Sequence, residues 1–212
     1  MYKAKILSYL EYRTPAIYHA TATLLHSIDC IQEKMLREVG VTNVDALLKF
    51  HLAPLNARRD MAMLGLIHRC VLGLGPEQFR EFFKMKASSA HPDGRNTLTR
   101  HNLQVETHRN GKFLDMLKWS VLGLVDIYNL LPQNVVNAKT VRLFQRRLQD
   151  MLREVAKNEN AQWGNLFSPR LELWNHPLVN WRSYKKGCDE RIVVKDNAPA
   201  RCIDAWINFG NG

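Results

Sequence analysis

The segment from residue 138 to residue 157 constrains the fold most strongly, because its apolar side chains recur with the period of an α-helix. At roughly 100° per residue, these side chains fall within one narrow arc. They are Val141, Phe144, Leu148, Met151, Leu152 and Val155. Asn137 stands where it can cap the first turn. Such a helix must bury one face, so we expect a helical domain around it.

Helical periodicity also fills the N-terminal part of the chain. It predicts helices over residues 3–12, 23–39, 43–50, 55–72 and 77–85. The second of these has one apolar face, made of Leu24, Ile28, Ile31, Met35 and Val39. Gly40 supplies its stop, and Thr42 and Asp45 have the spacing of a capping box for the next helix. The helix over 55–72 is apolar on nearly every side, which predicts burial between other helices.

Two other segments lack this periodicity. Residues 87–112 are rich in serine, proline, glycine and histidine, which predicts a polar linker between helical groups at 1–86 and 113–157. Residues 158–212 are predicted to form an irregular basic tail, with a strand hint only at 192–194. They hold four of the five tryptophans, Trp163, Trp174, Trp181 and Trp206. These side chains are expected to anchor the tail on the helical body, although they could also stack on bases. The predicted fold class is mainly α, with two helical groups, a polar linker and an irregular Trp-rich C-terminal tail.

The net charge and the cysteines indicate which partners and which cellular compartment to expect. The chain has 30 lysines and arginines against 20 acidic residues, a formal charge of +10, which favours polyanionic partners such as RNA or DNA. It contains no apolar run of membrane-spanning length and no secretory signal. The chain has four widely scattered cysteines, Cys30, Cys70, Cys188 and Cys202. A disulfide framework would need denser spacing, so we interpret them as reduced thiols. We expect an intracellular protein, nuclear or cytoplasmic, that does not enter a membrane.

Local catalytic motifs are absent from the sequence. It has no adjacent aspartate pair for a two-metal polymerase site, no phosphate-binding loop and no nucleophile elbow. One near-match to a nuclease is Asp93 followed by Glu106, with His108 where lysine belongs, and a polar loop with chance carboxylates is the favoured alternative. His101 and His108 are interpreted as solvated loop histidines rather than zinc ligands. We therefore expect no enzyme, no cofactor and no metal.

Two groups of cations are candidates for contacts with phosphates. The cations of 138–157 occupy an arc almost opposite the apolar one: Lys139, Arg142, Arg146, Arg153 and Lys157. They could track a nucleic-acid backbone, or form a solvated face with helical pairs to Asp150 and Glu154. Arg58 and Arg59 lie near a helix start, where cations oppose the helix dipole. An internal salt bridge is the favoured compensation there, and a nucleic-acid phosphate is the alternative.

Several blocks of the sequence resemble one known family. Residues 9–20 read YLEYRTPAIYHA, residues 52–69 read LAPLNARRDMAMLGLIHR, and residues 120–132 read SVLGLVDIYNLLP. Their order and spacing are similar to the region downstream of the reverse transcriptase palm in non-LTR, LINE-like retrotransposon polyproteins. The resemblance covers most of residues 6–170 and does not extend to residues 171–212. It implies that residues 1–86 form a thumb-like helical region beside a template–primer duplex.

The resemblance does not carry catalytic activity to this chain, because the palm and its metal-binding aspartates are absent. We expect a non-catalytic fragment that binds RNA or DNA backbone without sequence preference. The expected contacts are Arg58, Arg59, Lys139, Arg142, Arg146 and Arg153. The alternative is a helical protein-interaction scaffold that packs on a reverse transcriptase core domain. A metal-dependent nuclease is the third and least favoured hypothesis.

Overall fold

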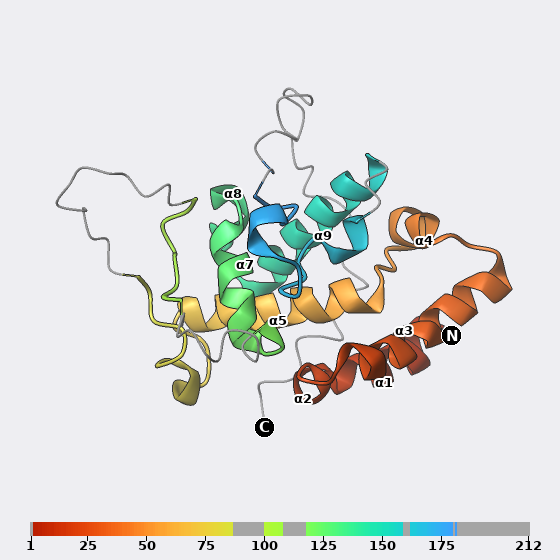
Figure 1. Ribbon diagram of the computed structural model, residues 1–212, viewed down its shortest axis with the longest axis horizontal. Helices are drawn as coiled ribbons and strands as arrows, with labels where there is room; N and C mark the ends of the chain where they lie inside the picture. Colours follow the sequence, from red (N-terminus) through yellow and green to blue (C-terminus); the bar gives the residue numbers. More distant parts are fainter. Residues whose placement is uncertain (1, 87–99, 108–117, 159–161, 180, 182–212) are drawn as a thin grey trace.

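The computed structural model describes residues 2–86, 100–107, 118–158, 162–179 and 181 (Figure 1), and it is mostly helical, as predicted. The N-terminal elements are a π-helix at Lys3–Leu7, α1 Ser8–Tyr12, α2 Thr14–Ile17, α3 Ala22–Val39, α4 Asn43–Phe50, α5 Leu55–Val71 and a 3₁₀ turn at Glu77–Phe79. The later elements are 3₁₀ turns at Val121–Gly123, Trp163–Asn165 and Leu173–Asn175, with α7 Leu124–Leu130, α8 Gln133–Val136 and α9 Val141–Lys157 between the first two.

Helix α5 is the axis of the molecule. In Figure 1 it runs across the centre, with α7, α8 and α9 on one side and α1 to α3 on the other. Gly65 lets α9 approach it closely, because a Cβ at this position would lie 2.6 Å from the Gln145 side chain and 3.3 Å from that of Val141. The prediction that α5 is buried between other helices is confirmed by Leu64 and Ile67, which are fully buried.

One hydrophobic core joins the segments on both sides of the expected linker. It contains Leu64 and Ile67 of α5, Leu124 of α7, Leu148 of α9 and Phe167 of the segment that follows α9. Fully buried aliphatic side chains of this kind each stabilise the fold by about 1.5–3 kcal/mol. A second, smaller cluster ties the N-terminal helices together through Leu7, Leu36, Ala46, Leu52 and Leu55.

The predicted signals at the start of α4 are confirmed. The Thr42 hydroxyl accepts a 3.1 Å hydrogen bond from the Asp45 backbone N–H, and it donates a 3.0 Å bond to the Asp45 carboxylate. Gly40 ends α3 with a φ of 69°, a left-handed conformation that costs glycine little. A short helix, α2, follows α1 directly and carries Pro15 in its first turn, where proline is tolerated.

The start of α9 differs from the prediction. Its cap is Thr140, whose hydroxyl accepts a 3.2 Å bond from the Leu143 N–H, and not Asn137. The side-chain oxygen of Asn137 accepts a bond from Gln133 instead, because Gln133 is the first residue and Asn137 the C-cap of the separate helix α8. The apolar arc of α9 is confirmed, since Phe144, Leu148, Met151, Leu152 and Val155 are all buried.

The predicted helix over 77–85 is wrong beyond its first turn. Met85 forms an isolated antiparallel bridge with Val105, in which the Lys86 N–H donates to the Gln104 carbonyl at 2.8 Å. Extended pairing buries Phe83 and Val105 in the core, and a helix there would not bring this part of the expected linker onto it. Residues 100–107 of the expected linker thus pack on the core, while residues 87–99 and 108–112 lie outside the described part of the chain.

Helix α3 packs on a different arc from the one its apolar pattern predicts. Leu25, Gln32 and Leu36 are buried, whereas Leu24 is 61% exposed, Ile31 45% and Val39 66%. At about 100° per residue, the two arcs are centred roughly 90° apart. The buried arc prevails because it carries Asp29 and Gln32, whose side chains bind Arg59 and the Ala53 carbonyl.

The tryptophans of the predicted tail divide into two kinds. Trp181 is 5% exposed and belongs to the main core, so it anchors this segment as expected. Trp174 is 78% exposed and anchors nothing in the described part of the chain. Trp206 and the strand hint at 192–194 lie outside the described residues.

Candidate functional site

The two arginines near the start of α5 are paired inside the protein. Arg58 Nε contacts the Glu11 carboxylate of α1, and both side chains are largely buried. Arg59 forms two parallel hydrogen bonds to the Asp29 carboxylate of α3, at 2.7 and 2.8 Å. The structure therefore agrees with the favoured interpretation of an internal salt bridge, and each cation has its own carboxylate.

The candidate cations of α9 and the turn before it are not brought together as one surface. Arg153 donates a 3.0 Å hydrogen bond to the Leu48 carbonyl near the end of α4. Lys139 is exposed, and Arg142 and Arg146 are half-buried. Thus Arg58, Arg59 and Arg153 serve internal contacts, and the remaining three cations lie over the first turns of α9.

Several cationic side chains in this chain donate hydrogen bonds to backbone carbonyl groups. Lys3 Nζ donates to the Phe50 carbonyl, so the C-terminal end of α4 receives two cations, Lys3 and Arg153. Arg147 donates to the Asn134 carbonyl of α8. Arg100 donates to the carbonyls of Leu130, Leu178 and Val179, which ties the 100–107 segment to α7 and the C-terminal turn. Cations are favourable at helix C-termini, so part of the positive charge serves the fold.

The nuclease and metal hypotheses gain no site in the described residues. Asp93 and His108 lie outside them, and Glu106 is exposed at the edge of the bridge. His101 is 3% exposed and bonds the Tyr128 carbonyl at 2.9 Å, so its predicted solvation is wrong. Among the residues that the structure describes, no three histidine, cysteine, aspartate or glutamate side chains gather as metal ligands would.

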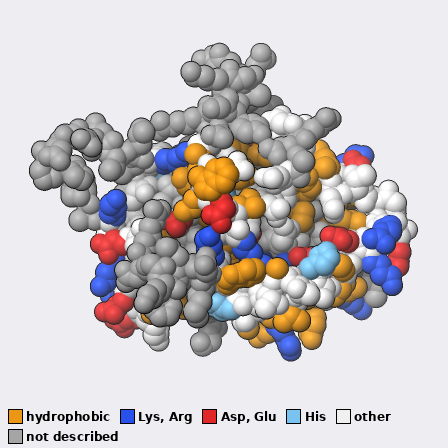
Figure 2. All heavy atoms as spheres, in the orientation of Figure 1, with side chains coloured by type: hydrophobic (Ala, Val, Ile, Leu, Met, Phe, Trp, Pro, Cys, Tyr) orange, Lys and Arg blue, Asp and Glu red, His pale blue; other side chains and the backbone are white. Residues whose placement is uncertain are grey.

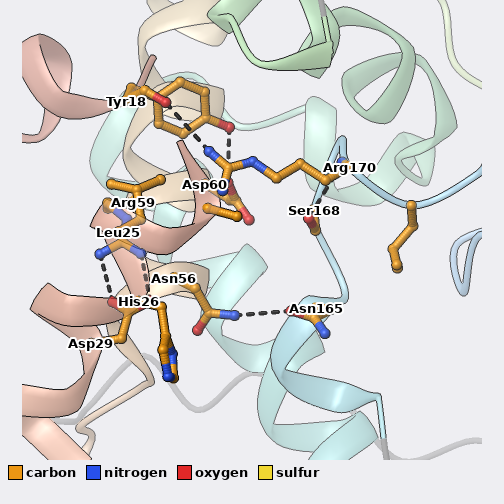
Figure 3. A pocket seen from close by; sticks show the side chains of 12 residues that line it. Tyr18, Leu25, His26, Asp29, Asn56, Arg59, Asp60, Asn165, Ser168 and Arg170 are labelled. Atoms are coloured by element: carbon orange, nitrogen blue, oxygen red, sulfur yellow. Dashed lines mark hydrogen bonds and ion pairs between the residues drawn. The ribbon is translucent and has the colours of Figure 1, made fainter. Parts of the chain in front are cut away.

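A polar pocket lies between α2, α3, α5 and the segment 165–171 (Figure 3). Its volume is about 240 Å³. The polar and charged side chains that line it are Tyr18, His26, Asp29, Asn56, Arg59, Asp60, Asn165, Ser168 and Arg170. They come from helices of the N-terminal region and from a turn more than 100 residues later in the sequence.

The floor of the pocket is a buried carboxyl group. Asp60 accepts a 2.8 Å hydrogen bond from the Tyr18 hydroxyl, and both residues are buried. Burial raises the pKa of Asp60 to about 7, although the Tyr18 hydrogen bond and the two nearby arginines, Arg170 and Arg59, lower it. Burial also raises the pKa of Tyr18 well above its ordinary value, so Tyr18 remains a hydrogen-bond donor at neutral pH.

The walls of the pocket are held by hydrogen bonds of their own. On one side, Arg59 and Asp29 neutralise each other. One turn earlier in α5, the Asn56 amide nitrogen donates to the Gly164 carbonyl at 3.1 Å and to the Asn165 side-chain oxygen at 3.0 Å. Figure 3 shows this bond running from Asn56 to Asn165 of the C-terminal segment. Both walls are thus fixed in place, as preformed ligand sites are.

Arg170 enters the pocket from the C-terminal segment. Its guanidinium carbon lies 4.7 Å from the centre of the Trp119 ring, and Nη2 reaches the Tyr18 carbonyl at 3.4 Å. Sequence reasoning missed Arg170, Ser168 and Tyr18 as site residues. The local signal at Arg170 is one basic residue after a proline, and only the tertiary fold brings it beside α2.

Comparison with known proteins identifies no relative of this chain, since no protein-family model, no curated protein and no solved structure matches it. Among the described residues, no helix combines the length and the apolar character that crossing a bilayer requires.

Proposed function

We propose that this chain is a non-catalytic helical scaffold that docks on a protein partner through the exposed apolar arc of α3. One observation carries the proposal, which is that three large apolar side chains on one arc of α3, Leu24, Ile31 and Val39, are exposed. The other two apolar residues of that arc, Ile28 and Met35, are half-buried and pack against the smaller N-terminal core cluster. A stripe with this helical spacing typically lies against another surface.

Other apolar side chains are exposed in the same N-terminal layer. Tyr9 and Tyr12 of α1 are each 63% exposed, and Ile6 is 46% exposed. Figure 2 shows hydrophobic side chains along the lower edge of one face, where Figure 1 places the N-terminal helices. Large apolar patches on a folded protein mark binding surfaces, and each fully covered aliphatic side chain contributes about 1.5–3 kcal/mol.

The partner with the best fit is a reverse transcriptase core domain. The resemblance of residues 9–20 and 52–69 to post-palm segments implies that this helical layer follows such a core in a polyprotein. The use of Arg58, Arg59 and Arg153 in internal contacts also favours a scaffold over an extended phosphate-binding surface.

A binding experiment with the fingers-and-palm region of a LINE-like polyprotein tests this function. The double variant Leu24→Ser with Ile31→Ser should lose co-elution in size-exclusion chromatography, because both side chains belong to the exposed arc. The matched control, Glu33→Ser with Arg37→Ser, changes two exposed residues of α3 outside that arc and should retain it. Equal binding by both double variants, or no binding by the unmodified chain, would reject the scaffold role.

A second candidate role is sequence-independent binding to RNA or DNA backbone. The observation in its favour is that Lys139 is exposed and Arg142 and Arg146 are half-buried over the first turns of α9. In a filter-binding titration at 50 and 200 mM salt, the affinity should fall steeply as the salt concentration rises. The reason is that each phosphate contact releases about one counterion. Replacing Lys139 and Arg146 by glutamine should flatten that dependence. Affinity that ignores salt would exclude this role.

A further inference from the structure

The polar pocket contains one cation, Arg170, that forms no salt bridge with a carboxylate among the described residues, although it lies close enough to Asp60 to lower the pKa of that carboxyl. The other arginine of the pocket, Arg59, forms a salt bridge with Asp29. The Arg170 side chain makes one long hydrogen bond, of 3.4 Å, to the Tyr18 carbonyl. A guanidinium has five N–H donors, so most of those of Arg170 are available to a ligand.

Trp119 holds this cation without neutralising it. The indole ring covers one face of the guanidinium at 4.7 Å, and its attraction is that of a cation for a π-system. Stacking of this kind leaves the edge of the guanidinium, where the N–H groups lie, free for in-plane hydrogen bonds. Figure 3 shows this edge directed toward Tyr18 and Asp60 above the hollow.

Two neutral side chains on the same segment add further donors. Asn165 is fixed by Asn56 through its side-chain oxygen, which leaves its amide nitrogen as a donor at the pocket lining. The Ser168 hydroxyl accepts a bond from the Arg170 N–H and keeps its own proton to donate. The lining therefore offers donors from three side chains within a six-residue turn.

We propose that this pocket binds a phosphate group, with Arg170 as the principal contact and Asn165 and Ser168 as neutral donors. A phosphate presents three or four acceptor oxygens in different directions, which matches donors that come from three separate side chains. A carboxylate offers two oxygens in one plane and would leave part of this set unused. The volume of about 240 Å³ also holds more than the anion, so the phosphate belongs to a larger molecule such as a nucleotide or a nucleic-acid end.

Asp60 opposes an anion in the same pocket. It lies close enough to influence the charge of Arg170, and burial raises its pKa to about 7. At pH 8 the carboxylate is mostly ionised and repels a bound phosphate. Asparagine in its place keeps an oxygen that can accept the Tyr18 hydrogen bond and removes the charge.

The test uses the full chain in isothermal titration at pH 8. The probes are inorganic phosphate, adenosine monophosphate, a 5′-phosphorylated eight-nucleotide RNA and, as a carboxylate for comparison, acetate. The Arg170→Gln variant should bind roughly ten- to a hundredfold more weakly, since it loses charge-assisted hydrogen bonds. The matched control, Arg37→Gln, changes an exposed arginine outside the pocket and should bind as the unmodified chain does. The Asp60→Asn variant should bind on the order of tenfold more tightly, through the removed repulsion.

Each result decides the proposal. A gain of affinity in Asp60→Asn cannot come from misfolding, so it supports the assignment even if Arg170→Gln is unstable. Binding of the free monophosphates identifies a small-molecule source, and binding of the RNA alone identifies a nucleic-acid end. No binding of any probe, equal binding by Arg170→Gln, or acetate binding as tight as phosphate would overturn it. The Leu24→Ser and Ile31→Ser double variant should retain phosphate binding. Failure of the scaffold role and failure of the phosphate site can therefore be told apart.

Discussion

Arg59 and Asp29 face each other with both terminal nitrogens on both carboxylate oxygens, at 2.7 and 2.8 Å, and this pair joins α5 to α3. The Arg59 side chain is 7% exposed and that of Asp29 is 20% exposed, so water screens the pair little. Together with the hydrogen bond from Gln32 to the Ala53 carbonyl, this pair helps to fix α3 on an arc that contains a carboxylate, and it leaves Leu24, Ile31 and Val39 exposed.

Removal of one partner should be costly. Arg59→Gln leaves the Asp29 carboxylate partly buried without its cation, and the free energy of unfolding should fall by about 2–4 kcal/mol in a urea titration. The control, Arg80→Gln, removes an exposed arginine 3.9 Å from Glu77 and should change stability by less than about 0.5 kcal/mol. Similar values for the two variants would contradict the structural importance of the Arg59–Asp29 pair.

Two of the half-buried arginines of α9, Arg146 and Arg153, should differ in their effect on stability. Arg153→Met loses the bond to the Leu48 carbonyl and should lower the free energy of unfolding by about 1–2 kcal/mol. Arg146→Met changes the same helix face without losing such a bond, and its midpoint of thermal unfolding should stay close to that of the unmodified chain. If Arg146→Met proved the more destabilising, the capping of α4 by Arg153 would not matter to the fold.

The close approach of α5 and α9 can be tested with a double-mutant cycle. Gly65→Ala places a methyl group 2.6 Å from the end of the Gln145 side chain, so it should lower stability by about 1 kcal/mol despite the better helix propensity of alanine. In a Gln145→Ala background the contact is relieved, and Gly65→Ala should then stabilise the protein. Additive effects in the urea midpoints would show that the two positions do not touch.

Much of the helical framework could be predicted from local sequence signals. The α9 arc, the Thr42–Asp45 cap and the Gly40 stop each depend on residues within a few positions of one another, and each is confirmed. The errors lie where tertiary contacts override a local pattern. Residues 82–85 leave the helical pattern because Phe83 and Val105 are buried together in the core.

The candidate site could be predicted only in part. The presence of Arg58 and Arg59 at a helix start correctly predicted internal carboxylate partners, because the helix dipole requires compensation. The identity of those partners, Glu11 and Asp29, depends on how α1 and α3 cross α5. Arg170 is still harder to predict, since its neighbour Tyr18 is 152 residues away in the sequence.

The buried carboxyl group of the pocket should make stability depend on pH. The pKa of Asp60 is about 7 in the folded protein, against 3.8 as its ordinary value. The folded state therefore holds more protons between these values, and its stability decreases as pH rises from about 4 to 7. The Asp60→Asn variant has no carboxyl group at this position and therefore does not lose stability in this way. Its free energy of unfolding should exceed that of the unmodified chain by up to about 4 kcal/mol at pH 8 and by little at pH 4. A difference in urea stability that does not grow with pH would contradict a protonated Asp60.

Three buried histidines should act in the opposite direction, and the Asp60→Asn background isolates them. Burial lowers the pKa of His68, His101 and His176 below their ordinary 6.5, while each ring bonds a backbone carbonyl. The unfolded chain then takes up more protons, so their contribution is complete above about pH 6.5 and is lost as pH falls below it. Urea titrations at pH 7.5, 6.0 and 5.0 should show a progressive loss. Stability that is constant over this range would mean that the three rings are already charged or solvated in the folded protein.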